Sequence, residues 1–407
     1  MATQNIAFQR KAWQASNYSQ NIEGSKTLAV TAKVAELRRQ GIEVISLGAG
    51  EPDFNTPAAI CEAAIRAIHD GQTKYTPNAG IFELRQAIAE FLNAMGGDYA
   101  PEEILVSNGA KQSIVNALFA TLDVGDEVLL PTPYWTSYPE QVKMAGGTCV
   151  FLPTSANQHY KIHLEQLEEA ATAKTKLLIL NSPSNPTGMV YTKDELEAIC
   201  HFCLEHDILI LSDEIYIQLI YDAIETGSLA SFPEVRQQLL LVNGFSKSHA
   251  MTGWRLGYLA AKTPFIQAAM KIQSHTTSNA CSISQYAALA ALNMPQDELK
   301  LMIDEFKRRR DYTADRLSAM PGIELVRPQG AFYLFPSVEQ YFGRSAGGTV
   351  IRSAMDLSQY LLDAARIAVV PGEAFGAPGN IRISYATSME NLQAAMDRME
   401  EALHRLQ

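Results

Sequence analysis

The sequence lacks the features of a membrane protein, a secreted protein or a nucleic-acid-binding protein. No segment approaches the roughly 18 consecutive apolar residues that a membrane span requires. The first residues contain no apolar core of the kind found in signal peptides. Acidic residues outnumber basic ones, which gives a formal net charge of −11, whereas a nucleic-acid surface requires clustered Lys and Arg. We therefore expect no membrane partner and no nucleic-acid partner.

Cysteine is scarce, and its distribution does not fit a disulfide framework. The five cysteines are odd in number and scattered through apolar segments, which is typical of a reducing cytoplasmic compartment. Cys200 and Cys203 have the spacing of a metal or redox pair, but the sequence has no second pair. They lie in a segment with a helical pattern, Asp194 to His206, so we interpret them as helix-packing residues. The sequence predicts no metal site.

Short apolar runs that alternate with helical patterns fill the chain from Pro57 to Leu292. Their hydrophobicity is continuous, which is typical of parallel strands buried on both faces. The runs are Ile104–Val106, Val128–Leu130, Cys149–Leu152, Leu177–Leu180, Ile208–Leu211, Leu239–Val242 and Leu256–Leu259. The expected helices between them include Ile81–Met95, Gln112–Thr121 and Thr192–His206. The sequence therefore predicts an α/β domain with a mostly parallel seven-stranded sheet.

The remaining segments have a different pattern and predict a smaller α+β domain. We expect helices at Ser25–Gln40, Glu298–Met320 and Met355–Ala365 and strands at Val44–Leu47, Ile323–Val326, Phe332–Phe335 and Asn380–Tyr385. Within the long charged helix, Lys307–Arg310 is interpreted as a solvated face. The glycine-rich segment Gly343–Gly348 is expected to be a loop, and an amphipathic helix is expected to end the chain.

These patterns divide the chain into three parts. Residues 1–22 contain no acidic side chain and are predicted to form a flexible or partner-contacting arm, since they are short for a transit peptide. Residues 23–55 together with 293–407 are predicted to form the small domain. Residues 56–292 are predicted to form the large domain, so the two domains interleave in sequence.

A lysine and an arginine follow the apolar run Leu239–Val242 in a segment of small residues. Lys247 comes directly after Gly244-Phe245-Ser246, and Arg255 follows eight positions later. A lysine at the end of a buried strand loses hydration, which lowers its pKa and makes its neutral amine available as a nucleophile for carbonyl groups. A single lysine of this kind is usually a surface residue in a loop. The neighbouring residues favour the functional interpretation here.

Other polar residues also follow the predicted parallel strands, where ligands bind in α/β proteins. Asp213 follows Ile208–Leu211, and a carboxylate in such a place is costly unless it has a cationic partner. The alternative is an aspartate that caps the next helix. Arg382 lies among apolar strand residues and needs an anion, for which a carboxylate with two oxygens fits best.

Glycine-containing turns follow three further strands. Gly109 and Ala110 open a helix, where free N–H groups and the helix dipole favour a phosphate. The segment Asn181–Gly188 contains prolines and reads as a rigid turn. Gly48-x-Gly50 invites comparison with a dinucleotide-binding loop, but Asp53 stands where the third glycine would be, so we reject that interpretation.

Gly244 to Lys247 followed by Arg255 resembles the attachment site of class I aminotransferases, fold-type I enzymes that bind pyridoxal 5′-phosphate (PLP). Six motifs occur in the family's order, from Ser25-Lys26-Thr27 to Ser384–Ser388. The resemblance is closest to the bacterial-type branch of aspartate aminotransferases. It implies a fold-type I PLP-dependent transferase with a large α/β domain and a small α+β domain. It also implies a homodimer with shared active sites.

The resemblance assigns roles to individual residues. Lys247 forms the Schiff base with PLP and transfers protons. The other implied cofactor contacts are Gly109, Ala110, Lys111, Arg255 and, across the dimer interface, Tyr75 around the phosphate, with Trp135, Asn185, Asp213 and Tyr216 around the ring. The implied substrate contacts are Gly50, Lys111, Trp135, Asn185 and Arg382. For Trp135, a buried core position is the ordinary alternative.

The predicted reaction is amino transfer between L-aspartate and 2-oxoglutarate. No segment resembles the second substrate-binding arginine of mammalian-type aspartate aminotransferases. By resemblance to the bacterial-type branch, Lys111 replaces it for the distal carboxylate. The alternatives are an aminotransferase with other donors or acceptors, such as prephenate or aromatic amino acids, and a PLP-dependent lyase, since fold does not fix the reaction. An effector-binding domain of a transcription regulator is disfavoured, because no DNA-binding segment is found before Ser25.

Overall fold

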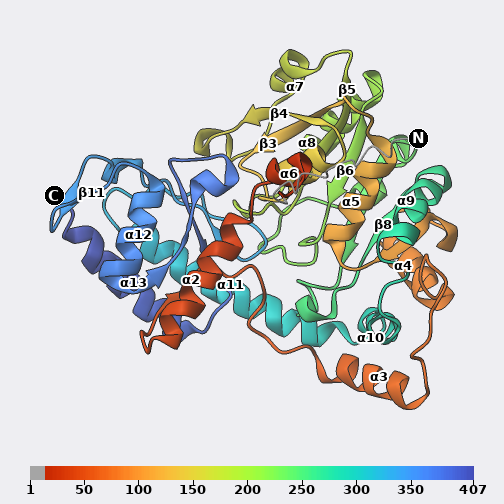
Figure 1. Cartoon of the computed structure of the whole chain (residues 1–407), viewed down its shortest axis with the longest axis horizontal. Helices are drawn as coiled ribbons and strands as arrows, with labels where there is room; N and C mark the ends of the chain where they lie inside the picture. The colour runs from red at the N-terminus through yellow and green to blue at the C-terminus, as the bar shows by residue number, and fades with distance from the viewer. Residues whose placement is uncertain (1–13) are drawn as a thin grey trace, which may run out of the picture.

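The structure is a computed structural model that describes residues 14–407, and a seven-stranded sheet forms its larger lobe (Figure 1). The strand order is β2-β8-β7-β6-β5-β3-β4, and within this sheet only β8 runs antiparallel to its neighbours. The strands are β2 (Ile104–Ser107), β3 (Glu127–Thr132), β4 (Thr148–Pro153), β5 (Thr175–Asn181), β6 (Leu209–Asp213), β7 (Leu239–Gly244) and β8 (Gly257–Ala260). The mostly parallel sheet predicted from the apolar runs is confirmed.

Both faces of this sheet are buried, which explains why its strands are apolar at every position. In β7, Leu239 and Leu241 pack into one hydrophobic cluster and Leu240 and Val242 into another. The second cluster includes side chains of α5 (Ala110–Thr121), α6 (Tyr138–Met144) and α9 (Thr263–Thr276). The first includes side chains of α4 (Phe82–Ala94), α7 (Leu164–Ala170), α8 (Lys193–Glu205) and α10 (Ser282–Leu292). The larger lobe therefore has three layers, with the sheet between two layers of helices. Helix α3 (Ala58–His69) packs on α10.

The second lobe combines segments from both ends of the described chain (Figure 1). Strand β1 (Ile45–Ser46) pairs in parallel with β12 (Ile367–Ala368). A second, antiparallel sheet has the order β13-β14-β9. Its strands are β9 (Tyr333–Leu334), β13 (Val370–Pro371) and β14 (Ile381–Ser384), and the helices of this lobe are α2 (Lys26–Arg39), α11 (Gln296–Ser318), α12 (Ala354–Ala365) and α13 (Met389–His404). This pairing supports the interleaved small domain, whose boundaries stay a prediction.

The expected solvated face of the long helix α11 is wrong for two of its arginines. Arg309 and Arg310 are buried, with 6% and 1% of their surface exposed. Arg309 Nη1 lies 2.7 Å from Asp53 Oδ1, and Arg310 Nη1 lies 2.6 Å from Asp222 Oδ2. Both carboxylates come from segments distant in sequence, which a single helical pattern cannot reveal. The arginines therefore hold α11 against the rest of the molecule.

Two other segments differ from expectation. Ile323–Val326 forms no strand, because only Glu324 finds a bridge partner, at Ser337. The glycine-rich loop Gly343–Gly348 instead contributes to a short hairpin of β10 (Ser345–Ala346) and β11 (Thr349–Val350). Gly347 and Gly348 have φ values of 56° and 87° at its turn, which glycine adopts without strain. The expected helices α2, α4, α5, α8, α11 and α12 are present within one to two residues at each end.

The predicted N-terminal arm is described only in part, because residues 1–13 lie outside the described residues. Residues 14–22 contain the one-turn helix α1 (Asn17–Gln20). The Tyr18 hydroxyl in this turn donates to the Met144 carbonyl at 3.1 Å, so this part of the arm contacts α6. From residue 14 onward, the chain has no helix that is both long enough and apolar enough to cross a membrane.

A buried amide supports the carboxyl end of β2, where α5 begins. The Gln273 side chain on α9 is fully buried. Its oxygen accepts hydrogen bonds from the Ser107 hydroxyl at 2.8 Å and from the Asn116 amide at 2.9 Å. Its nitrogen donates to the carbonyls of Asn78 and Val106, both at 2.9 Å. Since every polar atom of the Gln273 amide has a partner, this network fixes the turn from β2 into α5.

Candidate active site

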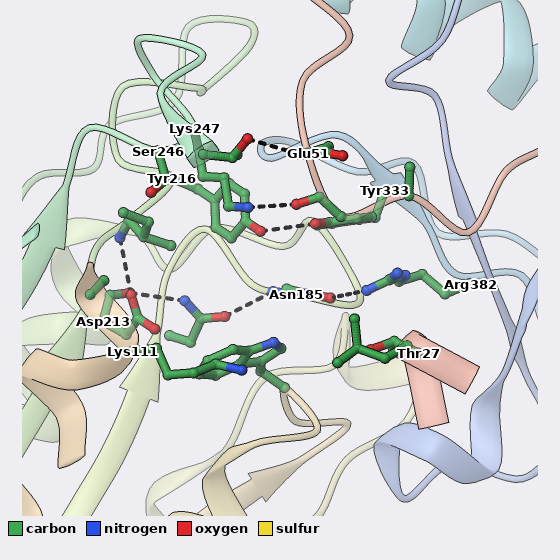
Figure 2. A pocket seen from close by; sticks show the side chains of 18 of the residues that line it. Thr27, Glu51, Lys111, Asn185, Asp213, Tyr216, Ser246, Lys247, Tyr333 and Arg382 are labelled. Atoms are coloured by element: carbon green, nitrogen blue, oxygen red, sulfur yellow. Dashed lines mark hydrogen bonds between the residues drawn. The ribbon is translucent and has the colours of Figure 1, made fainter. Parts of the chain in front are cut away.

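A cavity of about 420 Å³ lies at the carboxyl ends of the parallel strands, where the two lobes meet (Figure 2). Its walls come from the ends of β5 and β6, the segment after β7, the first turn of α5, the start of α2, residues 46–51 and the second lobe. Its polar and aromatic lining side chains are Thr27, Thr31, Ser46, Glu51, Lys111, Trp135, Tyr138, Asn181, Asn185, Asp213, Tyr216, Ser246, Lys247, Thr252, Arg255, Tyr333 and Arg382.

Asp213, the last residue of β6, presents a buried carboxylate to this cavity. It is 4% exposed and lies opposite Asn181 of β5 in the sheet. The Tyr138 hydroxyl donates to Asp213 Oδ2 at 2.7 Å, and the backbone N–H of Ile215 donates to Oδ1 at 3.1 Å. Burial raises the pKa of Asp213 to about 6, although these two hydrogen bonds oppose the shift. Neither donor is charged, so the ionised carboxylate would be stabilised by a ligand that brings a cationic N–H group.

Lys247 reaches into the same cavity from the segment after β7. Its ammonium donates to the Gly50 carbonyl, a contact visible in Figure 2. Burial lowers the pKa of Lys247 to about 8, and the nearby Arg255 and Arg382 add to this shift while Glu51 opposes it. Because the pKa is lowered from 10.5, a larger fraction of Lys247 is neutral near physiological pH than for an exposed lysine.

The first turn of α5 and Arg255 form a pocket for an anion. Helix α5 begins after Gly109, whose φ is 83°, and no side chain caps its first N–H groups. A Cβ atom at Gly109 would lie 2.7 Å from Arg255 Nη2, and one at Gly257 would lie 2.4 Å from the Ala110 nitrogen. The glycines therefore let the guanidinium and the helix N-terminus approach each other closely. Both favour negative charge, and a phosphate group suits the pair.

Arg382 on β14 is a buried cation that faces the cavity. It is 2% exposed, and Nη1 donates to Asn185 Oδ1 at 3.0 Å while Nη2 donates to the Gly48 carbonyl at 2.9 Å. Its Nε has no hydrogen-bond partner in the part of the chain that the structure describes. In that part of the chain, no carboxylate forms an ion pair with the Arg382 guanidinium. A guanidinium buried in this way is suited to bind a carboxylate from a ligand.

Lys111 and Trp135 lie side by side on the same wall of the cavity. The Lys111 ammonium lies 4.9 Å from the centre of the Trp135 ring. Burial of the ammonium and the positive charge of Arg255 lower the pKa of Lys111. Because Lys111 lies near Arg255, it could bind the same phosphate as Arg255, and it could instead bind a second substrate carboxylate. Both predicted roles of Lys111 therefore stay open.

The structure thus brings most of the predicted site residues together, but not all. Gly50, Ala110, Asn185 and Tyr216 line the cavity with the residues described above. Gly109 lies immediately behind Ala110 and packs against Arg255. Tyr75 does not reach the cavity of its own chain, because its side chain is 92% exposed.

Sequence reasoning missed two tyrosines of the site. Tyr138 on α6 donates to Asp213, and Tyr333 on β9 lies 2.9 Å from the Tyr216 hydroxyl. Both are buried, in segments that read from sequence as ordinary core. No sequence signal separates them from other buried tyrosines such as Tyr360, since their roles depend on which strand ends they meet.

Comparison with known proteins agrees with this geometry. Residues 42–399 match the family "Aminotransferase class I and II". The chain is 49% identical to an aspartate aminotransferase of Bacillus sp. (strain YM-2) over 386 residues, which covers 94% of this chain and 97% of that relative. It is 46% identical to a probable aspartate/prephenate aminotransferase of Aquifex aeolicus, over 95% of this chain and 98% of the relative.

Solved structures show the same likeness. The aspartate aminotransferase from Rhizobium meliloti has a TM-score of 0.94 and 41% identity, over 97% of this chain and all of that chain. The aspartate aminotransferase from Thermus thermophilus with maleate has a TM-score of 0.90 and 40% identity, over 96% of this chain and 100% of that chain. The predicted family and fold type are confirmed, and the chain belongs to the class I and II aminotransferases.

Proposed function

We propose that this aminotransferase binds PLP and transfers an amino group between L-aspartate and 2-oxoglutarate. The observation that carries the proposal is a set of charged side chains in one cavity that form no ion pair with one another or with any other residue of 14–407. Asp213 offers a buried anion, while Arg255 and Arg382 offer two separate cations, and Lys247 lies among them with a lowered pKa. A cationic ring nitrogen, a phosphate, a substrate carboxylate and a carbonyl are the complementary groups.

The residues present fit PLP group by group. Asp213 would hold the ring nitrogen. The N-terminus of α5 and Arg255, which Gly109 and Gly257 allow to lie close together, would hold the phosphate. Trp135 would cover the ring, Asn185 and Tyr216 would face its oxygen, and the Lys247 amine would bond to its aldehyde carbon. When bound, PLP supplies an electron sink for the negative charge that develops at the substrate Cα.

The chain's own residues supply the rest of the reaction. Arg382 binds the α-carboxylate, which places the Cα hydrogen near Lys247. With PLP and substrate bound, the Lys247 amine would accept that proton at Nζ and would later donate it again within the site. A pKa of about 8 suits both directions of transfer, because the amine can be neutral or protonated near neutral pH.

The preference for aspartate is proposed for Lys111. Aspartate has two carboxylates, and Arg382 can bind only one of them. Lys111 lines the same cavity from the start of α5, and its ammonium, which forms no ion pair within the described residues, could reach the other carboxylate. The relatives reported above are described as aspartate aminotransferases, and some as aspartate/prephenate aminotransferases, which supports a dicarboxylic donor and leaves a wider choice of acceptors.

We also propose that the enzyme is a homodimer whose active sites are shared. Tyr75 supports this, because it is 92% exposed in the single chain and its loop is held in place by Gln273 and Gln285. An exposed tyrosine on a fixed loop can reach a neighbouring subunit. A cytoplasmic location stays a prediction from the composition.

The first test concerns the cofactor. The purified protein is expected to show the visible absorbance of lysine-bound PLP, and Lys247→Ala is expected to lose it, together with about 10²–10⁴-fold of the transamination rate. Lys33→Ala is the control, since Lys33 is exposed on α2, pairs with Glu36 and does not line the cavity. A wild-type protein that stays colourless after incubation with PLP would contradict the proposal.

The second test concerns the shared site. Hybrid dimers of Lys247→Ala and Tyr75→Phe subunits would contain one site in which both native residues meet across the interface. We expect such hybrids to recover about half of the wild-type activity per dimer, as one of the two sites is intact. Activity equal to the plain average of the two parent variants would show instead that Tyr75 acts within its own subunit.

The third test concerns the donor. Loss of a charge-assisted hydrogen bond costs about 1.5–3 kcal/mol, so Lys111→Ala is expected to lower kcat/KM for aspartate roughly ten- to a hundredfold. Alanine and phenylalanine should be little affected, and PLP should stay bound. Lys143→Ala, at an exposed pair on α6, is the matched control. An equal loss for all donors with weaker PLP binding would assign Lys111 to the phosphate alone.

A further inference from the structure

Tyr333 occupies a central place in the cavity and contacts two of its functional side chains, Tyr216 and Arg382. It lies on β9 of the second lobe, its side chain is fully buried, and it lines the cavity beside Gly50. A Cβ atom on Gly50 would lie 3.6 Å from the Tyr333 hydroxyl, an ordinary contact distance, so Gly50 and this hydroxyl are neighbours in the cavity. Figure 2 shows Tyr333 between Tyr216 and Arg382.

The hydroxyl of Tyr333 meets the hydroxyl of Tyr216. The two oxygens lie 2.9 Å apart, and the rings meet edge to face with centres 5.9 Å apart. This is the one hydrogen bond that the Tyr333 hydroxyl makes within residues 14–407. Burial raises the pKa of both tyrosines, so both hydroxyls keep their protons at neutral pH. Only one of the two can donate to the other, which leaves the second proton free for another acceptor.

The ring of Tyr333 meets the guanidinium of Arg382. The Arg382 Cζ atom lies 4.5 Å from the centre of the Tyr333 ring and 5.0 Å from that of Phe375. Two of its nitrogens are already bound to Asn185 and Gly48. A desolvated guanidinium over an aromatic face is stabilised by the ring's electrons and limited in its rotation.

We propose that Tyr333 is a positioning residue that serves both halves of the site, its hydroxyl orienting Tyr216 and its ring holding Arg382. The proposal rests on the proposed function, in which Tyr216 faces the oxygen of the PLP ring and Arg382 binds the substrate carboxylate. The Tyr333 hydroxyl donates to Tyr216, so that the Tyr216 proton points toward the ring oxygen. Because hydrogen bonds in a chain strengthen one another, Tyr216 becomes a stronger donor.

The hydroxyl is tested with Tyr333→Phe in the PLP-loaded enzyme. A weaker Tyr216 donor leaves the ring oxygen more basic, so the pH at which the visible absorbance of bound PLP changes should rise. Cooperative strengthening of about 10–30% of a charge-assisted bond corresponds to a shift of roughly 0.1–0.7 pH unit. The dissociation constant for succinate, an unreactive dicarboxylate, should stay within about twofold, because the ring over Arg382 remains.

The ring is tested with Tyr333→Leu, which removes both the hydroxyl and the aromatic face. This variant should show the same absorbance shift and should also bind succinate about three- to thirtyfold more weakly, the range expected for a lost cation–π contact. Tyr360→Phe is the matched control, because it removes one buried hydroxyl that donates to the Ala402 carbonyl at 2.9 Å, on α12 and outside the cavity. It should change neither measurement.

The outcomes separate this proposal from the proposed function. Absence of PLP absorbance in the wild-type protein would reject the proposed function itself. A wild-type enzyme that binds PLP while Tyr333→Phe keeps the wild-type absorbance titration would overturn the role of the hydroxyl. Equal weakening of succinate binding in Tyr333→Phe and Tyr333→Leu would overturn the role of the ring. If Tyr333→Leu does not fold, the two measurements on Tyr333→Phe still decide the role of the hydroxyl.

Discussion

The buried carboxylate of Asp213 is the constraint on which the site depends. It is almost fully enclosed, and among residues 14–407 its carboxylate accepts hydrogen bonds from a phenol and a backbone N–H alone. An ionised carboxylate in such surroundings costs several kcal/mol unless a cation joins it. Its raised pKa of about 6 is the physical expression of that cost. A ligand with a cationic ring nitrogen would remove this penalty, so the buried carboxylate of Asp213 favours a ligand that carries a positive charge there.

The fold keeps the carboxylate of Asp213 apart from the guanidinium groups of Arg255 and Arg382, although all three line one cavity. Asp213 is fixed by the register of β6 against β5, and Arg255 by a loop that two glycines allow to approach α5. Arg382 comes from the second lobe, and Arg310 on α11 joins that lobe to Asp222 of the larger lobe. Anion and cations that neutralised each other directly would leave nothing for a ligand. Their separation by rigid elements keeps each one available.

The sequence predicted the large sheet well, because strands buried on both faces are apolar at every position and end in conspicuous polar residues. Lys247, Asp213 and Arg382 stood out for that reason. Features that depend on pairing across long distances in sequence were not predictable in the same way. The strand expected at Ile323–Val326 finds only a single bridge, and the arginines of α11 are buried by carboxylates far away in the chain. Tyr333 was missed because the sequence around a tyrosine in a buried strand is the same whether its side chain packs in the hydrophobic core or lines a cavity.

The most direct test of the central claim is the protonation state of the cofactor's ring nitrogen. Nuclear magnetic resonance of the enzyme loaded with ¹⁵N-labelled PLP measures it at neutral pH, where a carboxyl group with a pKa of about 6 is ionised. We expect the chemical shift of a protonated pyridinium in the wild-type enzyme and of a neutral pyridine in Asp213→Ala. A neutral ring nitrogen in the wild-type enzyme, with PLP bound through Lys247, would contradict the claim that Asp213 defines the site.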